Sequence, residues 1–326
     1  MKDYSDIYYA KILLFGEYGV IFDSMGLTIP YTHFRGELSY HNEDKYTDYD
    51  FAIASNNLLK EYIPYLKIER ESSGLKCDFD IERFDDDISN GLYFESTIPL
   101  GFGLGSSGAL VAALYDKYAL DKINNVRNLK NGEILKLREI FSQLESFFHG
   151  KSSGLDPLNS YIKFPLLINS KKDIRIVGLP RNKVDGNDAV FLVNTGKPGK
   201  TQPLVNYFLK KCEDKHFFNL VKNEMIPLTN AIIKNLVDVE IETFFDNLAI
   251  LSNFQLENLS HMIPGEFHNI WQNGIDTGDY YLKLCGSGGG GYLLGFTKNY
   301  EETKLYLTDK GYNYNTVFRN PKLNLS

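Results

Sequence analysis

The 326-residue chain has few cysteines and no pattern that would give them a structural role. Cys77, Cys212 and Cys285 are widely separated and odd in number, so they form neither a zinc-ligand pattern nor a disulfide framework. We therefore expect a reduced, cytoplasmic protein.

Long apolar runs, basic blocks and repeats are also missing. No apolar run approaches the roughly 20 residues of a membrane span, and the first residues are not typical of a signal peptide. The net charge is −7 and no basic block occurs, so we expect neither a membrane nor a nucleic acid as partner. The absence of Gly-x-x-x-x-Gly-Lys-Ser/Thr excludes a Walker loop.

The composition is that of a large mixed protein. A hydrophobic content of 43% suffices for a large core, and the length suggests two domains. Alternation and β-rich composition predict strands at 8–15, 28–40 (as a strand pair), 75–84, 92–99, 189–193, 280–284 and 292–296. Helical spacing predicts helices at 51–66, 129–148, 201–259 and 301–311, with Pro64 disturbing the first, and 161–179 is strand-like. We predict a polar loop at 42–50, an acidic turn at 85–87 and a domain boundary between 160 and 190.

The stretch from Pro99 to Tyr115 carries the strongest local signal. Gly101, Gly103 and Gly105 alternate, two serines follow, and a helical apolar face then begins. Leu110, Ala113, Leu114 and Tyr118 share that face. Alternating glycines let backbone N–H groups approach a ligand, and a helix N-terminus directed at the same point favours an anion. The stretch therefore indicates a phosphate site, in which Ser106 and Ser107 cap the helix or offer hydroxyls to a metal or phosphate.

Two other interpretations of this stretch are available. A capped helix after a glycine turn would have the same composition. The dinucleotide fingerprint also fits Gly103-x-Gly105-x-x-Gly108, but it fits Gly286-x-Gly288-x-x-Gly291 equally well. A helical region follows Gly108 where a nicotinamide fold needs a second strand ending in an acid, so the pattern favours a phosphate loop of another type.

Four residues outside this loop are candidates for chemistry. Lys11 lies within an apolar strand, where it either reaches the surface or points to phosphate or an acidic group. Glu145 and Asp156 could act as a metal ligand and as a proton acceptor; alone, each would be an ordinary surface glutamate or turn aspartate. His149 is a base by residue type, but no triad spacing surrounds it. The glycine run 286–291 lies between two β segments, which favours a tight loop against a ligand over a linker.

Three blocks in order along the chain resemble the motifs of the GHMP small-molecule kinases. They are Lys11-Ile-Leu-Leu-Phe-Gly-Glu17, Pro99-Leu-Gly-Phe-Gly-Leu-Gly-Ser-Ser-Gly108-Ala, and Lys283-Leu-Cys-Gly-Ser-Gly-Gly-Gly-Gly291. Within this superfamily, Glu145-Ser-Phe-Phe-His149-Gly-Lys-Ser-Ser-Gly154-Leu-Asp156 and Asn194-Thr-Gly-Lys-Pro-Gly-Lys-Thr201 are similar to segments of the mevalonate kinases.

The resemblance implies an α+β, two-domain GHMP kinase fold. The N-terminal domain, 1–175, would resemble ribosomal protein S5, and the C-terminal domain, 176–326, would be ferredoxin-like. The implied reaction is transfer of the ATP γ-phosphate to a small-molecule hydroxyl, with mevalonate giving 5-phosphomevalonate for isoprenoid biosynthesis. A homodimer is compatible with the resemblance.

The resemblance also implies roles for individual residues. Asp156 would be the catalytic base, and Lys11 would lower the pKa of the attacking hydroxyl. Ser107 and Glu145 would hold Mg²⁺. ATP would be bound by Pro99, Gly101, Gly103, Leu104, Gly105, Ser106, Ser107 and Gly108. The substrate would be bound by Glu17, Tyr18, His149, Ser153, Gly154, Thr201, Gly286, Ser287, Gly288 and Gly289.

The chain departs from the family pattern mainly on the acceptor side. Tyr18 replaces a histidine near the acceptor, Lys151 and Ser152 stand where Asn-Pro is usual, and Tyr9-Ala10 replaces Pro-Gly. Gly108 replaces the usual alanine, which we expect to be tolerated. Other acceptors (phosphomevalonate, a sugar or sugar phosphate, homoserine), a diphosphomevalonate-decarboxylase-like reaction and a non-catalytic nucleotide sensor are the alternatives.

Overall fold

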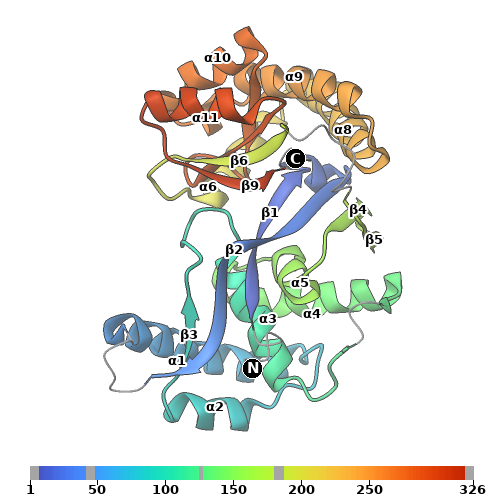
Figure 1. Ribbon diagram of the computed structural model, residues 1–326. Helices are drawn as coiled ribbons and strands as arrows, with labels where there is room; N and C mark the ends of the chain where they lie inside the picture. Colours follow the sequence, from blue (N-terminus) through green and yellow to red (C-terminus); the bar gives the residue numbers. More distant parts are fainter. Residues whose placement is uncertain (1–6, 42–47, 125–127, 180–186, 320–326) are drawn as a thin grey trace.

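The computed structural model describes residues 7–41, 48–124, 128–179 and 187–319, which form two antiparallel sheets (Figure 1). In the first sheet the strand order is β1-β2-β4-β5, and β3 pairs with the far end of β2. Its strands are β1 (Tyr8–Phe15), β2 (Gly26–Tyr40), β3 (Leu92–Ser96), β4 (Leu166–Ser170) and β5 (Asp173–Ile176). The long β2 therefore joins every part of this sheet except β5.

Five helices pack against the first sheet, and α3 has the longest uninterrupted buried stretch of them (Figure 1). They are α1 (Tyr49–Ser72), α2 (Ile81–Ser89), α3 (Ser106–Tyr118), α4 (Asn131–His149) and α5 (Leu155–Ile162). All residues of α3 from Gly108 to Tyr115 are buried, which is the pattern of a helix enclosed on all sides. The predicted apolar face of Leu110, Ala113, Leu114 and Tyr118 is confirmed.

The second sheet has the order β7-β8-β6-β9. Its strands are β6 (Ala189–Asn194), β7 (Tyr280–Leu284), β8 (Tyr292–Thr297) and β9 (Tyr314–Arg319). The helices are α6 (Thr201–Lys211), α7 (Lys215–Leu220), α8 (Ile226–Asp238), α9 (Ile241–Asn258), α10 (His268–Thr277) and α11 (Tyr300–Asp309), with a π-helical turn between α7 and α8. The chain order strand, helices, strand, strand, helix, strand with this pairing is the ferredoxin-like arrangement that was predicted.

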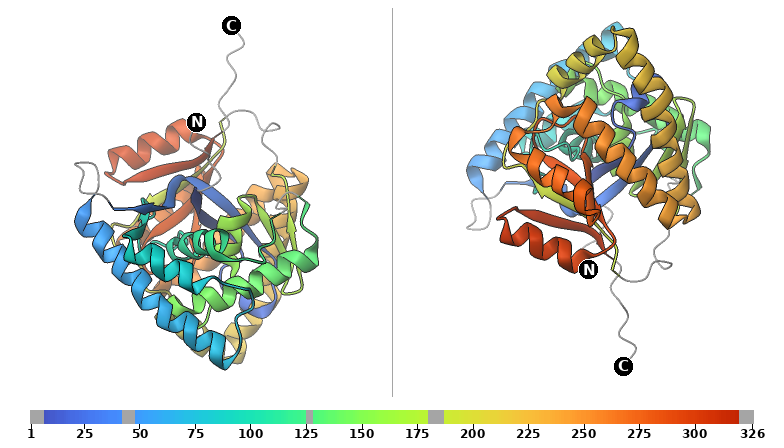
Figure 2. Two further views of the ribbon diagram at one scale, coloured as in Figure 1. Left: turned by 90° about the horizontal axis from the view of Figure 1, so that it is seen from below. Right: turned by 90° about the horizontal axis from the view of Figure 1, so that it is seen from above.

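Aromatic side chains join the two sheets in one continuous core, and the two further views show both halves closely packed (Figure 2). The Phe15 ring at the end of β1 stacks on Phe296 of β8 at 5.4 Å between centroids. It also meets Phe244 of α9 edge-on at 6.0 Å. The predicted boundary between residues 175 and 176 falls in the last two residues of β5 and remains a prediction.

The predicted strand at 75–84 and the predicted acidic turn at 85–87 are wrong. The structure has α2 from Ile81 to Ser89, and the three consecutive aspartates lie within it. The Asp80 side chain accepts a hydrogen bond from the Arg83 N–H at 3.1 Å, which caps the helix. Ile81, Phe84 and Ile88 are buried at helical spacing, and this signal outweighs the charge of the aspartates.

Three other predictions of element bounds need correction. Residues 28–40 form one strand within β2, not a pair. Helix α1 continues through Pro64 to Ser72, because Pro64 lies on the exposed face, where water can satisfy the carbonyl that lacks its N–H partner. The region 161–179 begins as the end of α5 before β4 and β5 follow. Residues 42–47 of the predicted polar loop lie outside the described residues.

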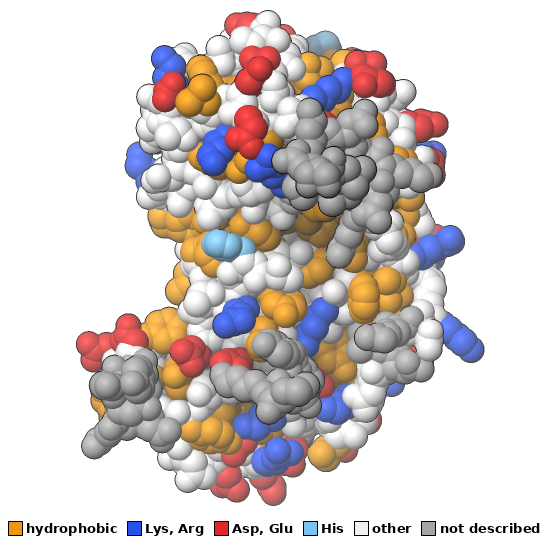
Figure 3. Space-filling model, in the orientation of Figure 1, with side chains coloured by type: hydrophobic (Ala, Val, Ile, Leu, Met, Phe, Trp, Pro, Cys, Tyr) orange, Lys and Arg blue, Asp and Glu red, His pale blue; other side chains and the backbone are white. Residues whose placement is uncertain are grey.

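The remaining predicted strands and helices are confirmed to within a few residues. Within the described ranges, no helix is both long and apolar enough to cross a bilayer. On the face shown in Figure 3, acidic and basic side chains are interspersed, and the outline narrows between the upper and lower parts.

Candidate active site

The glycine loop adopts the backbone that the alternation predicted. Gly101, Gly103 and Gly105 have φ of +77°, +74° and +76°, which only glycine adopts readily. The loop is anchored to β1, because the Lys11 N–H donates to the Leu104 carbonyl at 2.9 Å. Pro99 is half-buried at the entry to the loop.

Helix α3 begins at Ser106, and its N-cap is Gly105 without a side-chain hydrogen bond. The suggested capping role of Ser106 and Ser107 is therefore wrong. The glycine that precedes them takes the left-handed conformation at the cap, so the serine hydroxyls remain free for other partners. The Ser107 hydroxyl donates a hydrogen bond to the Glu145 carboxylate.

Lys11 and Asp156 form an ion pair beneath this loop. The distance from Lys11 Nζ to Asp156 Oδ1 is 3.0 Å, with 8% of the lysine side chain and 35% of the aspartate side chain exposed. Burial lowers the pKa of Lys11, but the charge and hydrogen bond of Asp156 outweigh it, so the pKa is raised and the lysine stays a cation. The partly exposed Asp156 can therefore meet a small molecule while Lys11 fixes its position.

The loop and α3 touch this pair directly. A Cβ on Gly105 would lie 2.9 Å from Lys11 Cγ and 3.4 Å from Asp156 Oδ2. A Cβ on Gly108 would lie 2.7 Å from the Asp156 carbonyl carbon and from the Pro157 nitrogen. The glycine loop and α3 thus lie too close to Lys11 and Asp156 for a side chain to be added at 105 or 108 without a shift.

Glu145 of α4 lies buried between two serine hydroxyls. Ser107 Oγ donates to Glu145 Oε1 at 3.0 Å and lies 3.0 Å from His149 Nε2, while Ser152 Oγ donates to Glu145 Oε2. Burial, followed by the negative charge of Asp156, raises the pKa of Glu145 to about 7. A buried carboxylate held by two serine hydroxyls is a donor set that suits Mg²⁺ together with phosphate oxygens.

The protein does not supply a complete metal site by itself. Among the residues that the structure describes, no group of three or more His, Cys, Asp or Glu side chains is placed to hold a metal ion. Ser107 and Glu145 therefore fit an ion that keeps most of its ligands from water and a bound phosphate.

Replacing Glu145 by Gln is expected to remove a pH dependence of stability. Because the folded-state pKa of about 7 lies above the ordinary 4.5, the folded protein binds this proton more tightly than the unfolded chain. The contribution is complete below about pH 4.5 and is lost as the pH rises through about 7, which amounts to about 3 kcal/mol. Urea unfolding at pH 5 and pH 8 should show a larger loss of stability for the wild type than for Glu145→Gln.

Glu139→Gln serves as the matched control, since Glu139 lies on the same helix with 60% of its side chain exposed. This variant should lose as much stability between the two pH values as the wild type does. If Glu145→Gln behaves in the same way as Glu139→Gln, the pKa of Glu145 is not raised.

The turn after β1 provides the opposite side of the site. Glu17 is buried and pairs with Lys283 of β7, with 2.5 Å between Nζ and Oε1. Tyr18 packs on Phe208 of α6 at 4.4 Å between ring centroids and donates its hydroxyl to the Ser287 carbonyl at 2.6 Å. Ser287 Oγ in turn donates to Thr201 Oγ1 at 3.2 Å. Tyr18, Thr201 and Ser287 are thus brought together by side chains from both halves.

Three glycine-containing loops interlock above this turn. The Gly199 N–H donates to the Gly101 carbonyl at 2.8 Å, and the Gly291 N–H donates to the Lys197 carbonyl at 2.6 Å. A Cβ on Gly288 would lie 2.4 Å from the Met262 carbonyl oxygen, and one on Gly289 would lie 2.5 Å from Leu204 Cδ1, whereas Gly286 faces open space. Gly288 is buried by this packing and Gly289 is the exposed member of the run, while Gly286 and Ser287 are partly exposed and Ser287 contacts Thr201.

Two residues of the 149–156 segment differ in their surroundings. Gly154 is buried, and a Cβ there would lie 2.1 Å from the Arg138 carbonyl oxygen, so its position is determined by packing on α4. Ser153 is exposed, and its hydroxyl accepts the Leu155 N–H at 3.3 Å. Their predicted substrate contacts remain predictions.

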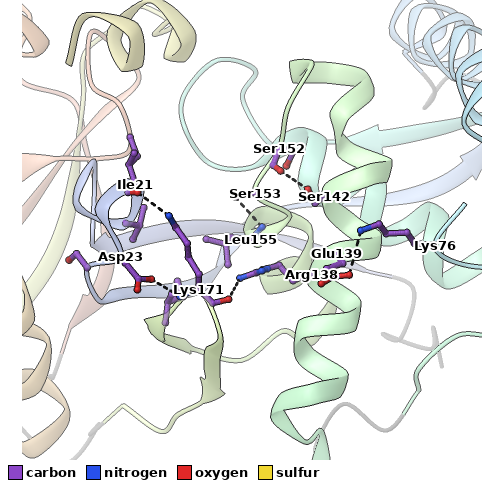
Figure 4. A pocket seen from close by; sticks show the side chains of 13 residues that line it. Ile21, Asp23, Lys76, Arg138, Glu139, Ser142, Ser152, Ser153, Leu155 and Lys171 are labelled. Carbon is purple, nitrogen blue, oxygen red and sulfur yellow. Dashed lines mark hydrogen bonds and ion pairs between the residues drawn. The ribbon is translucent and has the colours of Figure 1, made fainter. Parts of the chain in front are cut away.

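A depression of about 450 Å³ adjoins this segment on another side (Figure 4). Leu155 lines it, whereas the neighbouring Asp156 is directed to Lys11. Its cations already contact the protein: Arg138 donates to the Lys171 carbonyl at 2.6 Å, and Lys171 Nζ donates to the Ile21 carbonyl at 3.1 Å. We therefore place the chemistry at Asp156 and not in this depression.

Sequence analysis missed two members of the site. Ser152 was noted only as a departure from a usual proline, yet its hydroxyl donates to Glu145, which a proline could not do. Lys283 lies in the C-terminal motif, but no role was predicted for it. It could have been found in the same way as Lys11, since both are lysines within an apolar strand.

Residues 57–161 match the family model described as GHMP kinases N terminal domain. This match and the two-sheet fold confirm the resemblance to GHMP kinases, and the α+β fold is that of this superfamily. Among relatives, the chain is 24% identical to the mevalonate kinase of Pyrococcus furiosus over 314 residues, covering 89% of this chain and 88% of that protein.

Solved structures agree on the fold. The L. major mevalonate kinase in complex with R-mevalonate has a TM-score of 0.61 at 17% identity, covering 97% of this chain and 96% of that one. The Streptococcus pneumoniae phosphomevalonate kinase in complex with phosphomevalonate and AMPPNP also has a TM-score of 0.61, at 13% identity, covering 95% and 99%. The fold alone therefore does not select an acceptor.

Proposed function

We propose that this protein is an ATP-dependent kinase that transfers the γ-phosphate to a hydroxyl of a small molecule, and that the acceptor is mevalonate, giving 5-phosphomevalonate. The observation that carries the proposal is the Lys11–Asp156 ion pair directly beneath the glycine loop and next to Glu145. A phosphate site, a proton acceptor and a metal-ligating carboxylate within one cluster are what phosphoryl transfer requires.

In this proposal each residue has a defined task. Asp156 orients the acceptor hydroxyl and accepts its proton, while Lys11 fixes the carboxylate and stabilises the developing alkoxide. The backbone N–H groups of 101–105 and the start of α3 bind the phosphates. Ser107 and Glu145 are the residues that would hold Mg²⁺, which neutralises phosphate charge when bound.

Mevalonate is favoured as acceptor by the relative from Pyrococcus furiosus, to which the chain is similar over nearly its full length. One observation favours a second candidate, another acceptor within the same superfamily. Tyr18 stands at the acceptor side, and its hydroxyl is already used by Ser287, so it is not free to hydrogen-bond a ligand as a donor.

The test is ADP release from Mg-ATP with a panel of acceptors: mevalonate, phosphomevalonate, diphosphomevalonate, homoserine, galactose and heptose 7-phosphate. Turnover with mevalonate alone supports the full proposal. Turnover with another member would support the kinase activity but assign a different acceptor. Release of CO₂ from diphosphomevalonate would identify a decarboxylase. ATP binding without turnover of any member contradicts the proposed reaction and favours a sensor.

A further inference from the structure

A fully buried ion pair connects the two sheets next to the candidate active site. Lys283 is the penultimate residue of β7, with none of its side chain exposed, and Glu17, 3% exposed in its side chain, follows β1. Lys283 Nζ also donates to the Leu284 carbonyl at 2.6 Å and lies 5.3 Å from the centre of the Phe15 ring. Two of the three ammonium N–H groups thus donate to oxygen atoms of the protein, and the Phe15 ring lies nearby.

A pair of this kind is poorly explained by stability. Removing two charges from water costs about as much as their attraction returns, and apolar replacements of buried pairs are often neutral or stabilising. The pair does fix the position of β1 relative to β7, because the two charges remain in contact only in one arrangement of these strands.

The next residue along the chain makes a second contact across the same interface. Tyr18 has a φ of +60°, a conformation that a non-glycine residue rarely adopts. Its ring packs on Phe208, and its hydroxyl donates to the Ser287 carbonyl. Glu17, Tyr18, Lys283 and Ser287 together form what we call the cross-sheet clasp.

The clasp positions two segments that face the reacting groups. Ser287 belongs to the glycine run, which touches the phosphate loop: a Cβ on Gly291 would lie 2.8 Å from Phe102 Cα. On the other side, Glu17 is near enough to Lys11 for the lysine to lower the pKa of Glu17, although burial raises it overall. The clasp therefore connects the glycine run, through Ser287, to the neighbourhood of the Lys11–Asp156 pair, through Glu17.

We propose that Glu17 and Lys283 are positioning residues that set the acceptor side of the site, formed by Tyr18, Ser287 and Thr201, at the correct distance from Asp156. This inference rests on the proposed kinase function. It assigns to Glu17 a task performed through Lys283 and not through direct contact with substrate, since its carboxylate is buried against the lysine.

The experiment compares Lys283→Met with the double variant Glu17→Gln/Lys283→Met. The single variant leaves a buried carboxylate without a partner and is expected to be unstable, whereas the double variant removes both charges and should fold. For the double variant we expect a KM for the acceptor at least tenfold higher and a kcat at least tenfold lower, with the Kd for ADP within twofold of wild type.

Lys298→Met is the control, because it breaks an exposed ion pair with Glu242 in the same half of the protein. Its kinetic constants should equal those of the wild type. A double variant with wild-type acceptor KM and kcat, or one that loses ADP affinity as much as acceptor turnover, would overturn the inference.

Hydrogen–deuterium exchange separates this inference from the proposed function, because it needs no turnover. In the double variant, exchange should accelerate at least tenfold at residues 17–19 and 286–291 and stay unchanged in α2. If the wild type phosphorylates nothing but exchange accelerates there, the kinase assignment fails and the clasp stands. Unchanged exchange in those segments overturns the clasp whatever the activity.

Discussion

Replacing Asp156 by Asn is expected to lower kcat by about 10²- to 10⁴-fold, the range that a positioned general base contributes. The amide keeps the shape of the side chain and can still accept a hydrogen bond from Lys11 Nζ, 3.0 Å from Asp156 Oδ1 in the wild type. It cannot accept a proton from the acceptor hydroxyl. Because the phosphate loop is unchanged, the KM for ATP should stay within a few-fold of wild type when ADP release is measured.

Asp173→Asn is the matched control, because Asp173 lies in β5, where it pairs with Arg175 at the surface. This variant should keep the wild-type kcat. A kcat for Asp156→Asn within threefold of wild type would show that Asp156 is not the base and that the proton leaves by another route.

Replacing Gly108 by Ala is expected to destabilise the protein and to slow the reaction. The new Cβ would lie 2.7 Å from two backbone atoms, at Asp156 and Pro157, and 2.8 Å from Asp156 Cβ. Ala in a helix is more favourable than Gly by up to about 1 kcal/mol, but overpacking against backbone costs about 1–3 kcal/mol. The steric contact is therefore expected to make the net change in stability unfavourable. The substitution should move Asp156 and reduce kcat by about tenfold to hundredfold.

Thermal unfolding and steady-state kinetics measure both effects, and Gly132→Ala supplies the control. Gly132 lies in the first turn of α4, where an added Cβ would meet nothing within 4 Å. Its replacement should leave activity unchanged and stability equal or higher. A Gly108→Ala variant with wild-type melting temperature and kcat would mean that α3 and α5 are not packed at this distance.

Local patterns gave a correct account of most elements. Helices α3 and α4 and strands β1, β6, β7 and β8 were predicted because their apolar spacing is regular over a full element. The error at α2 arose where charge was given more weight than spacing: Ile81, Phe84 and Ile88 bury one face of a helix whose other face carries the aspartates. The effect of Pro64 was also predicted wrongly, because a proline disturbs a helix less on its exposed face, and the sequence alone did not show which face of α1 Pro64 occupies.

In the candidate site, too, local sequence patterns predicted some features, and contacts between distant segments determine the others. Glycine alternation predicted the backbone of the phosphate loop, because φ values above zero depend on the residue itself. The residues that this loop meets could not be found in that way. The partnership of Ser152 with Glu145 and that of Glu17 with Lys283 join positions 7 and 266 residues apart, and no local periodicity links them.

The sequence by itself therefore determined most of the strands and helices, the backbone of the glycine loop, and which family the motifs resemble. These properties follow from backbone preference and residue spacing. Only the tertiary structure decided that Glu145 is buried against two serine hydroxyls, that Gly108 has no room for a side chain, and that Glu17 is paired with Lys283. Burial and closest approach are properties of pairs of distant segments, so they exist only once the two sheets have packed together.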